Sequence, residues 1–296
     1  MKPVHVLGDI NLDVVMAGMQ ELPSSGREIL SRSATVKAGG SAANVAMMLA
    51  ARGWQVRFFG QVGQDHAGTL VCGELSRSGV DTSDLTIAMD EQTGVTVSLA
   101  YPEERMYVTF PGTLATTTLS HLKNGYIKED THLHIASFFL QKALGPQMGE
   151  LLQRAKEGGM STSLDPGGDP SGKWDMSCLR RYYRFIDWFL PNSDEIRGVT
   201  GAGSLLEALR TLPGAVRCLA VKAGERGVYT RYEGRVEHFP AISVTVVDTT
   251  CAGDCFDAGF LAGILEGESF ADAVRLGLSY AAQAVATVGL PIKKNP

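Results

Sequence analysis

Short apolar runs alternate with stretches of helical spacing along most of this chain, and that alternation restricts its fold more than any other feature. We expect strands over residues 1–9, 56–60, 133–136, 160–165, 185–190 and 218–221, and helices over 42–52, 148–157 and 255–265. Such alternation is typical of a parallel sheet with helices on both faces. Ligands of these sheets bind where the strands end. We therefore predict an α/β fold with its site at the carboxyl ends of the strands.

Two segments, residues 11–37 and 93–112, interrupt the alternation. Residues 95–100 and 105–110 flank the turn-rich stretch 101–104, which predicts a hairpin. We interpret both segments as a small β-structure that projects from the core as a lid. The alternative is an extra edge hairpin without a function. With the lid inserted, residues 1–296 form a single domain.

Composition argues against several kinds of partner. The net charge is −5 with no basic block, which argues against nucleic acid. No apolar run is long enough for a membrane span, and the N-terminus lacks the core of a signal peptide. The five cysteines are scattered and odd in number, which predicts reduced thiols and a cytoplasmic protein. Cys251 and Cys255 have no nearby histidine to complete a metal site.

The segment from Asp248 to Asp254, with the sequence DTTCAGD, predicts an anion site. It is a turn of small residues that opens a helix, where free N–H groups attract an anion that can approach closely. Asp254 places a carboxylate beside that anion, a position suited to accepting a proton. The alternative is that Asp254 only caps the helix.

A second glycine-rich segment covers residues 38–46. Gly39 and Gly40 allow a ligand to approach the backbone, and Asn44 offers both a donor and an acceptor. Asp13 lies near the end of the first predicted strand, where a carboxylate beside an amide can hold neighbouring hydroxyls. The alternatives are an ordinary turn and a solvated loop residue.

Two further turns are candidates for nucleotide contacts. Asn192 and Glu195 have the form of a capping box, and they could instead orient water on Mg²⁺ beside phosphates. Lys222, Gly224 and Gly227 lie in a strand–turn–strand segment that either contacts a nucleotide or is only a tight connection. The chain has no Walker A sequence and no GxGxxG that opens a helix, so neither a P-loop nor a dinucleotide site is expected.

Taken together, these motifs resemble those of the ribokinase-like, or PfkB, family of carbohydrate kinases. Residues 39–44, with Gly53 and Gly63, match the N-terminal signature in spacing, residues 248–254 match the C-terminal one, and residues 192–195 match the N-x-x-E motif. The resemblance covers nearly the whole chain. It departs at Cys251, where the family usually has Gly or Ala.

The resemblance implies a three-layer core with a central, mostly parallel sheet and a β-lid. It also implies MgATP-dependent phosphorylation of a hydroxymethyl group on a small carbohydrate, with Asp254 accepting the proton of the attacking hydroxyl. The transferred phosphoryl group would meet the backbone around Cys251, Ala252, Gly253 and Asp254. The sugar would be held by Asp13, Gly39, Gly40 and Asn44. The nucleotide would contact Asn192, Glu195, Lys222, Gly224 and Gly227, with Glu195 reaching Mg²⁺ through water.

Two further expectations follow from the resemblance. Family members often bind K⁺ through backbone carbonyls and an aspartate that matches Asp248, and residues 284–289 would supply the other carbonyls here. The lid is also a candidate surface for a homodimer.

Several alternatives stay open at this stage. A nucleoside kinase of the same family would need an aromatic residue that stacks on the base, and Phe110, Phe138 and Phe139 are candidates, although core packing explains the last two equally well. A sugar-sensing regulator without turnover is a different class. Arg105 could pair with an acidic substrate or simply be solvated. We favour a neutral sugar with a free hydroxymethyl group, and the sequence does not identify it.

Overall fold

The computed structural model describes residues 2–21, 24–101, 104–123, 125–287 and 289–291. Within this part of the chain a nine-stranded sheet has the order β13-β12-β11-β10-β9-β8-β1-β4-β5. The strands from β5 to β11 pair in parallel, whereas β12 and β13 are antiparallel. Their bounds are β1 Val4–Leu7, β4 Val56–Gly63, β5 Leu85–Ala88, β8 His132–Ala136, β9 Ser161–Asp165, β10 Trp188–Phe189, β11 Cys218–Lys222, β12 Val228–Tyr232 and β13 Arg235–Phe239.

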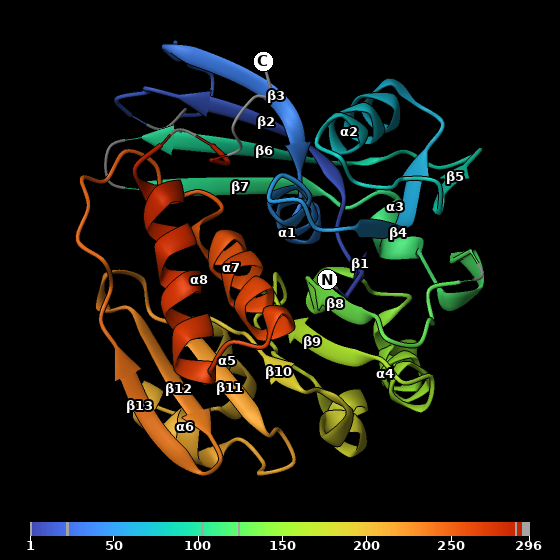
Figure 1. Cartoon of the computed structure of the whole chain (residues 1–296). Helices are drawn as coiled ribbons and strands as arrows, with labels where there is room; N and C mark the ends of the chain where they lie inside the picture. Colours follow the sequence, from blue (N-terminus) through green and yellow to red (C-terminus); the bar gives the residue numbers. More distant parts are fainter. Residues whose placement is uncertain (1, 22–23, 102–103, 124, 288, 292–296) are drawn as a thin grey trace.

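Helices cover both faces of this sheet (Figure 1). The bounds of the described helices are α1 Ser41–Ala50, α2 His66–Arg77, α3 Thr113–Thr116, α4 Met148–Glu157, α5 Ser193–Thr200, α6 Leu205–Thr211, α7 Ala252–Glu266 and α8 Phe270–Val285. One hydrophobic cluster joins the sheet to α1, α2, α7 and α8, and the other joins it to α4, α5 and α6. None of the described helices has both the length and the apolar character needed to cross a membrane.

A separate four-stranded sheet lies above the core in Figure 1, in the order β3-β2-β6-β7. Its strands are β2 Asn11–Ala17, β3 Ser33–Gly39, β6 Gly94–Tyr101 and β7 Glu104–Phe110. Because neighbouring residues on a strand face opposite sides, the register separates a polar row from an apolar one. The polar row contains Lys37, Asp13, Thr96 and Thr109, and the next row contains Val36, Val14, Val97 and Val108.

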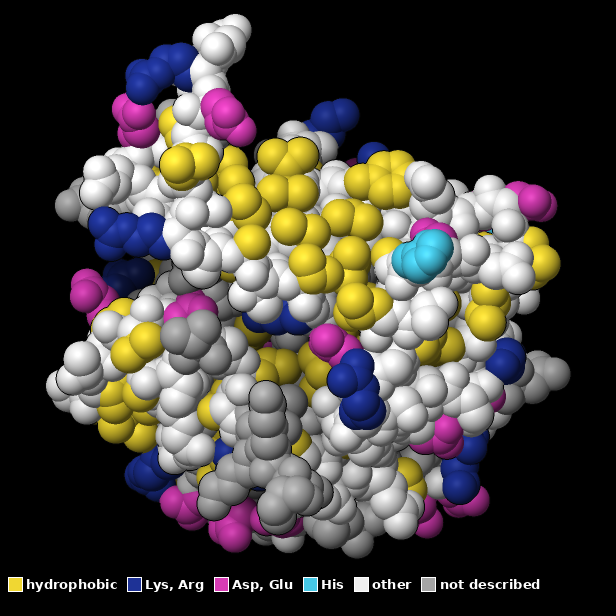
Figure 2. Space-filling view, turned by 90° about the horizontal axis from the view of Figure 1, so that it is seen from above, with side chains coloured by type: hydrophobic (Ala, Val, Ile, Leu, Met, Phe, Trp, Pro, Cys, Tyr) yellow, Lys and Arg dark blue, Asp and Glu magenta, His cyan; other side chains and the backbone are white. Residues whose placement is uncertain are grey.

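The apolar side of this small sheet is exposed. Val108 is 67% and Phe110 50% accessible, and Figure 2 shows hydrophobic side chains gathered over the top of the molecule. The polar side is therefore the one that faces the core.

The predicted α/β architecture is confirmed, and most predicted elements have close counterparts. The strand predicted over residues 185–190 is confirmed only for Trp188–Phe189, and Ser177–Phe185 forms a 3₁₀ helix. This strand is short because Phe185 and Ile186 end the helix instead of extending the sheet. The predicted lid segments correspond to the four strands of the small sheet, while Pro102 and Glu103 of the hairpin turn lie outside the described residues.

Candidate active site

A cleft of about 950 Å³ opens at the carboxyl ends of β9 and β11 and beside the start of α7. Five ionisable side chains line it, namely Asp165, Glu195, Lys222, Glu225 and Asp254. This is the position at which an open α/β sheet binds its ligands. The cleft is therefore our candidate active site.

Asp254 projects from the first turn of α7 and is bound by two side chains of α1. Ser41 Oγ donates to Asp254 Oδ1 across 2.5 Å, and Asn44 Nδ2 donates to Oδ2 across 2.7 Å. Burial raises the pKa of Asp254 to about 6, although these two hydrogen bonds act to lower it. The N-cap of α7 is Cys251, so the geometry argues against the reading in which Asp254 only caps its helix.

The start of α7 leaves backbone N–H groups directed at the cleft. The amides in the first turn of a helix have no partner within the helix. Ala252, Gly253 and Asp254 all line the cleft, but the N–H of Ala252 already donates to the Thr249 carbonyl across 3.4 Å. The amides of Gly253 and Asp254 are therefore the stronger candidates for an anion site.

Cys251 precedes this turn in the left-handed conformation, with φ of 61°. Its thiol accepts a hydrogen bond from Asn44 Nδ2 across 3.3 Å. Burial raises the pKa of the thiol, as do Asp254, Asp13 and Asp248, while Lys37 lowers it. The thiol is therefore neutral, and it lies where the small sheet meets α7.

Neither Gly39 nor Gly40 leaves room for a side chain without strain. A Cβ at Gly39 would lie 2.1 Å from Asp13 Cγ, and Gly40 has φ of 103°. Asp9, which the sequence reading missed, accepts from the Ser41 N–H across 2.8 Å and so caps α1. The sequence signal that could have identified Asp9 is its place, as an acidic residue just after the first strand.

Asp13 lies beside Lys37 on the polar row of the small sheet. Asn11 Nδ2 donates to Asp13 Oδ1 across 2.7 Å and to Thr96 Oγ1 across 3.1 Å. Burial raises the pKa of Asp13 to about 6, and the charge of Lys37 opposes that shift. Among the described residues Lys37 has no hydrogen bond or ion pair. The sequence reading missed both Asn11 and Lys37.

Asn192 and Glu195 form the capping box at the start of α5. Asn192 Oδ1 accepts from the N–H groups of Asp194 and Glu195, both across 2.9 Å. Glu195 Oε2 accepts from the Asn192 N–H, and its Oε1 accepts from Asn192 Nδ2. Burial and the charge of Asp165 raise the pKa of Glu195 to about 8. The capping reading is therefore confirmed, while both side chains still line the cleft.

The ammonium of Lys222 is held by two aspartates that the sequence reading missed. It donates to Asp165 Oδ2 across 2.8 Å and to Asp257 Oδ1 and Oδ2 across 3.1 and 2.9 Å. Gly224 and Gly227, with φ of 59° and 84°, form the connection from β11 to β12 and line the same cleft. Lys222 thus lines the cleft, but the N–H groups of its ammonium already donate to Asp165 and Asp257.

Comparison with known proteins places this site in a family. Residues 1–295 match the model of the pfkB family carbohydrate kinases. The chain belongs to that family. It is 27% identical to a ribokinase of Haemophilus influenzae, over 97% of this chain and 94% of the relative. It is 29% identical to a 2-dehydro-3-deoxygluconokinase of Bacillus subtilis, over 84% and 81%.

The fold of this pfkB-family kinase also agrees with solved structures. An Arabidopsis thaliana ribokinase complexed with ribose and ATP superposes with a TM-score of 0.82 at 23% identity, covering 100% of this chain and 96% of that one. This likeness confirms the ribokinase-like fold that the motifs implied.

One wall of the kinase cleft is apolar, which the sequence reading did not foresee. It combines the segment after β13 with one side of α8, and its members are Ile242, Val244, Val246, Leu278, Ala281, Ala282 and Val285. The three phenylalanines proposed for stacking lie elsewhere. Phe138 belongs to the hydrophobic cluster that joins the sheet to α4, α5 and α6, and Phe139 packs against that cluster. Phe110 is on the exposed side of the small sheet. Core packing accounts for Phe138 and Phe139.

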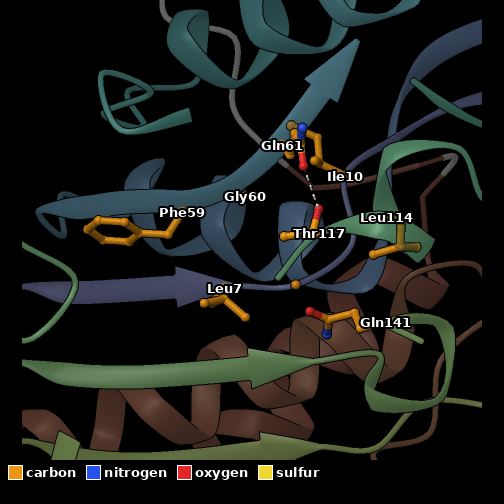
Figure 3. A pocket seen from close by; sticks show the side chains of 9 residues that line it. Leu7, Ile10, Phe59, Gly60, Gln61, Leu114, Thr117 and Gln141 are labelled. Carbon is orange, nitrogen blue, oxygen red and sulfur yellow. Dashed lines mark hydrogen bonds between the residues drawn. The ribbon is translucent and has the colours of Figure 1, made fainter. Parts of the chain in front are cut away.

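Two other features lie near this kinase site. A small cavity of about 10 Å³ lies where α3 meets β1 and β4, bordered by Gln61, Thr117 and Gln141 (Figure 3). It holds at most about one water molecule. In the segment expected to bind K⁺, the Val285 carbonyl accepts from the N–H groups of Val247 and Asp248. Val288, which belongs to the same segment, lies outside the described residues.

Proposed function

We propose that this chain transfers the γ-phosphate of ATP to a hydroxymethyl group of a small carbohydrate. The observation that carries the proposal is the placement of Asp254, which two α1 side chains hold at the start of α7 on the floor of the cleft. Membership of the carbohydrate kinase family supports the same reaction class. It gives no support to a regulator without turnover.

Asp254 has the properties of a general base in this reaction. A pKa of about 6 leaves its carboxylate ionised at neutral pH, yet close enough to neutrality to accept a proton. The N–H groups of Gly253 and Asp254 would stabilise negative charge on the transferred group. Removing one such donor typically costs about 3 kcal/mol of transition-state stabilisation.

The apolar wall and the cleft size fit a nucleotide. ATP would supply the phosphoryl group, with its base against Ile242, Val244 and α8 and its phosphates towards the start of α7. The related Arabidopsis ribokinase was solved with ribose and ATP. Gly224 and Gly227 would border the nucleotide, because both lie on this rim.

Two metal ions, Mg²⁺ and K⁺, are also part of the proposal, and fewer contacts support them. Asn192 and Glu195 satisfy each other, so they would reach Mg²⁺ only through water. For K⁺ beside Asp248, the Val285 carbonyl is already accepting two N–H groups, so other carbonyls of the 284–289 segment would be needed. Equal activity in K⁺ and in a bulky organic cation at matched ionic strength would exclude the K⁺ site.

The sugar would lie between Asp254 and the polar side of the small sheet, which would act as the lid. Asp13 and the backbone at Gly39 and Gly40 would hold its hydroxyls. Asn44 would act on the sugar indirectly, because its amide is engaged by Asp254.

A substrate panel with coupled ADP detection tests this function. It should include neutral pentoses and hexoses, nucleosides and sugar acids, each at saturating MgATP. Turnover of at least one sugar supports the proposal. Turnover of nucleosides alone would favour the nucleoside kinase, and ATP-independent sugar binding without any turnover would favour a regulator.

The exposed apolar side of the small sheet supports a homodimer formed through the lid. Val108 is 67% exposed on that face and belongs to the edge strand β7. Light scattering should show a dimer for the native chain and a monomer for Val108→Asp, and a native monomer at micromolar concentration would contradict it. All five cysteines are free, which agrees with the cytoplasmic location we propose.

A further inference from the structure

A buried charge cluster lies beneath the first turns of α7. Lys222 is 12% exposed in its side chain, Asp165 6% and Asp257 0%. Replacing such buried ionic groups by apolar residues is often neutral or even stabilising. Stability alone therefore gives little reason for three ionisable groups at this position.

The position of the cluster suggests another role. Asp165 ends β9, Lys222 ends β11, and Asp257 is three residues after Asp254 on α7. A Cβ at Gly253 would lie 3.7 Å from Lys222 Nζ. The ammonium thus lies directly beside the amides that face an anion in the cleft, where a fixed charge acts strongly because little water screens it.

The pKa values of the two carboxyl groups that hold Lys222 are shifted in opposite directions. Burial and the charge of Asp165 raise the pKa of Asp257 well above its usual range. Burial alone would also raise the pKa of Asp165, but Lys222 holds it below its usual value. Burial thus opposes ionisation of Asp257, whereas the ammonium stabilises the ionised form of Asp165.

We propose that Lys222 is a fixed cation that strengthens the anion site at the start of α7, and that Asp165 and Asp257 are the positioning residues that hold it there. Lys222 acts through its field, because its hydrogen bonds go to these aspartates. This inference rests on the proposed phosphoryl transfer, during which negative charge develops above Gly253.

The test compares two variants in one background. Asp257→Asn keeps an oxygen acceptor for Lys222, so the ammonium stays in place, and kcat of this variant is the reference value. Adding Lys222→Met to Asp257→Asn removes the cation, while the amide at position 257 can still donate to Asp165. We expect the double variant to melt below the single variant, because Asp165 loses its cation, so kcat is compared per folded protein. It should be at least about tenfold lower, with sugar KM little changed. Lys222→Arg should restore most of kcat.

Lys156→Met is the matched control. Lys156 Nζ pairs with Asp187 across 2.7 Å at the other end of the sheet, and losing that pair should leave kcat unchanged. The inference is overturned if kcat of the double variant equals that of Asp257→Asn, or if kcat falls only in proportion to lost folded protein. If the double variant does not fold, Lys222→Arg decides, because a fall in kcat beyond about tenfold with native stability contradicts a role for charge. A native chain without any sugar turnover would instead overturn the proposed function.

Discussion

The amide of Asn44 and the carboxylate of Asp254 are joined by a hydrogen bond of 2.7 Å, across 210 positions of the sequence. This bond connects the two glycine-rich signatures, one at the start of α1 and the other at the start of α7. Asn44 was expected to hold a sugar hydroxyl. In the structure it also orients the candidate base and lowers its pKa.

Removal of this amide should therefore change the pH dependence of turnover. Because the hydrogen bond stabilises the ionised carboxylate, Asn44→Ala should raise the pKa of Asp254 above its present value of about 6. The acid limb of the kcat profile should move to higher pH, and Ser41→Ala should move it in the same direction. Gln283→Ala, which removes an exposed amide on α8, is the control. An unmoved acid limb in both active-site variants would refute the link.

Replacement of the base should stabilise the fold at neutral pH. The usual pKa of an aspartate is 3.8 and that of buried Asp254 is about 6, so the folded chain holds a proton that the unfolded chain releases between these values. Its free energy of unfolding should fall as the pH rises through this interval, and Asp254→Asn removes that loss. The advantage of the variant should grow to at most about 3 kcal/mol above pH 7 and vanish near pH 4. Urea unfolding at both pH values measures it, and a pH-independent difference would contradict it.

The second role of Glu195 can be separated from capping. Glu195→Gln keeps an oxygen that can accept from the Asn192 N–H, so α5 should remain capped. Above pH 8, where the Glu195 carboxyl is ionised, we expect a higher Mg²⁺ requirement with little change in sugar affinity for the free enzyme. Titrations of activity with Mg²⁺ and of sugar by calorimetry measure the two effects. An unchanged Mg²⁺ requirement together with a lower melting temperature would leave only the capping role.

The polar side of the small sheet should decide substrate choice. Asp13→Ala should weaken sugar binding by roughly 1–3 kcal/mol, because buried hydroxyls would lose their acceptor. Lys37→Met tests whether the substrate is a neutral sugar or a sugar acid. If the substrate is neutral, as we favour, the variant should change the KM for gluconate and the KM for glucose by the same factor. A selective loss of the sugar acid would reverse that ranking. Arg105→Ala is the comparison, since its backbone lies on β7 four residues from Thr109, which is in the same row as Asp13.

The sequence predicted the parts of this molecule that depend on local pattern. The strand–helix alternation, the hairpin of residues 95–110 and the helix that follows Cys251 all depend on spacing and turn residues, and the structure has each of them. It did not predict Asp165 and Asp257, because their partner Lys222 lies 57 and 35 positions away and no local motif marks the contact. The apolar wall was missed for a similar reason, since it joins a loop to one side of α8.

The central claim is that Asp254 accepts a proton during transfer of a phosphoryl group from ATP to a sugar. The most direct measurement is kcat of Asp254→Asn on the best sugar of the panel, followed by ADP release, with sugar and ATP affinities measured on the same preparation. The account predicts a fall in kcat of at least about a hundredfold with both affinities preserved. A folded variant that retains near-native kcat would contradict it.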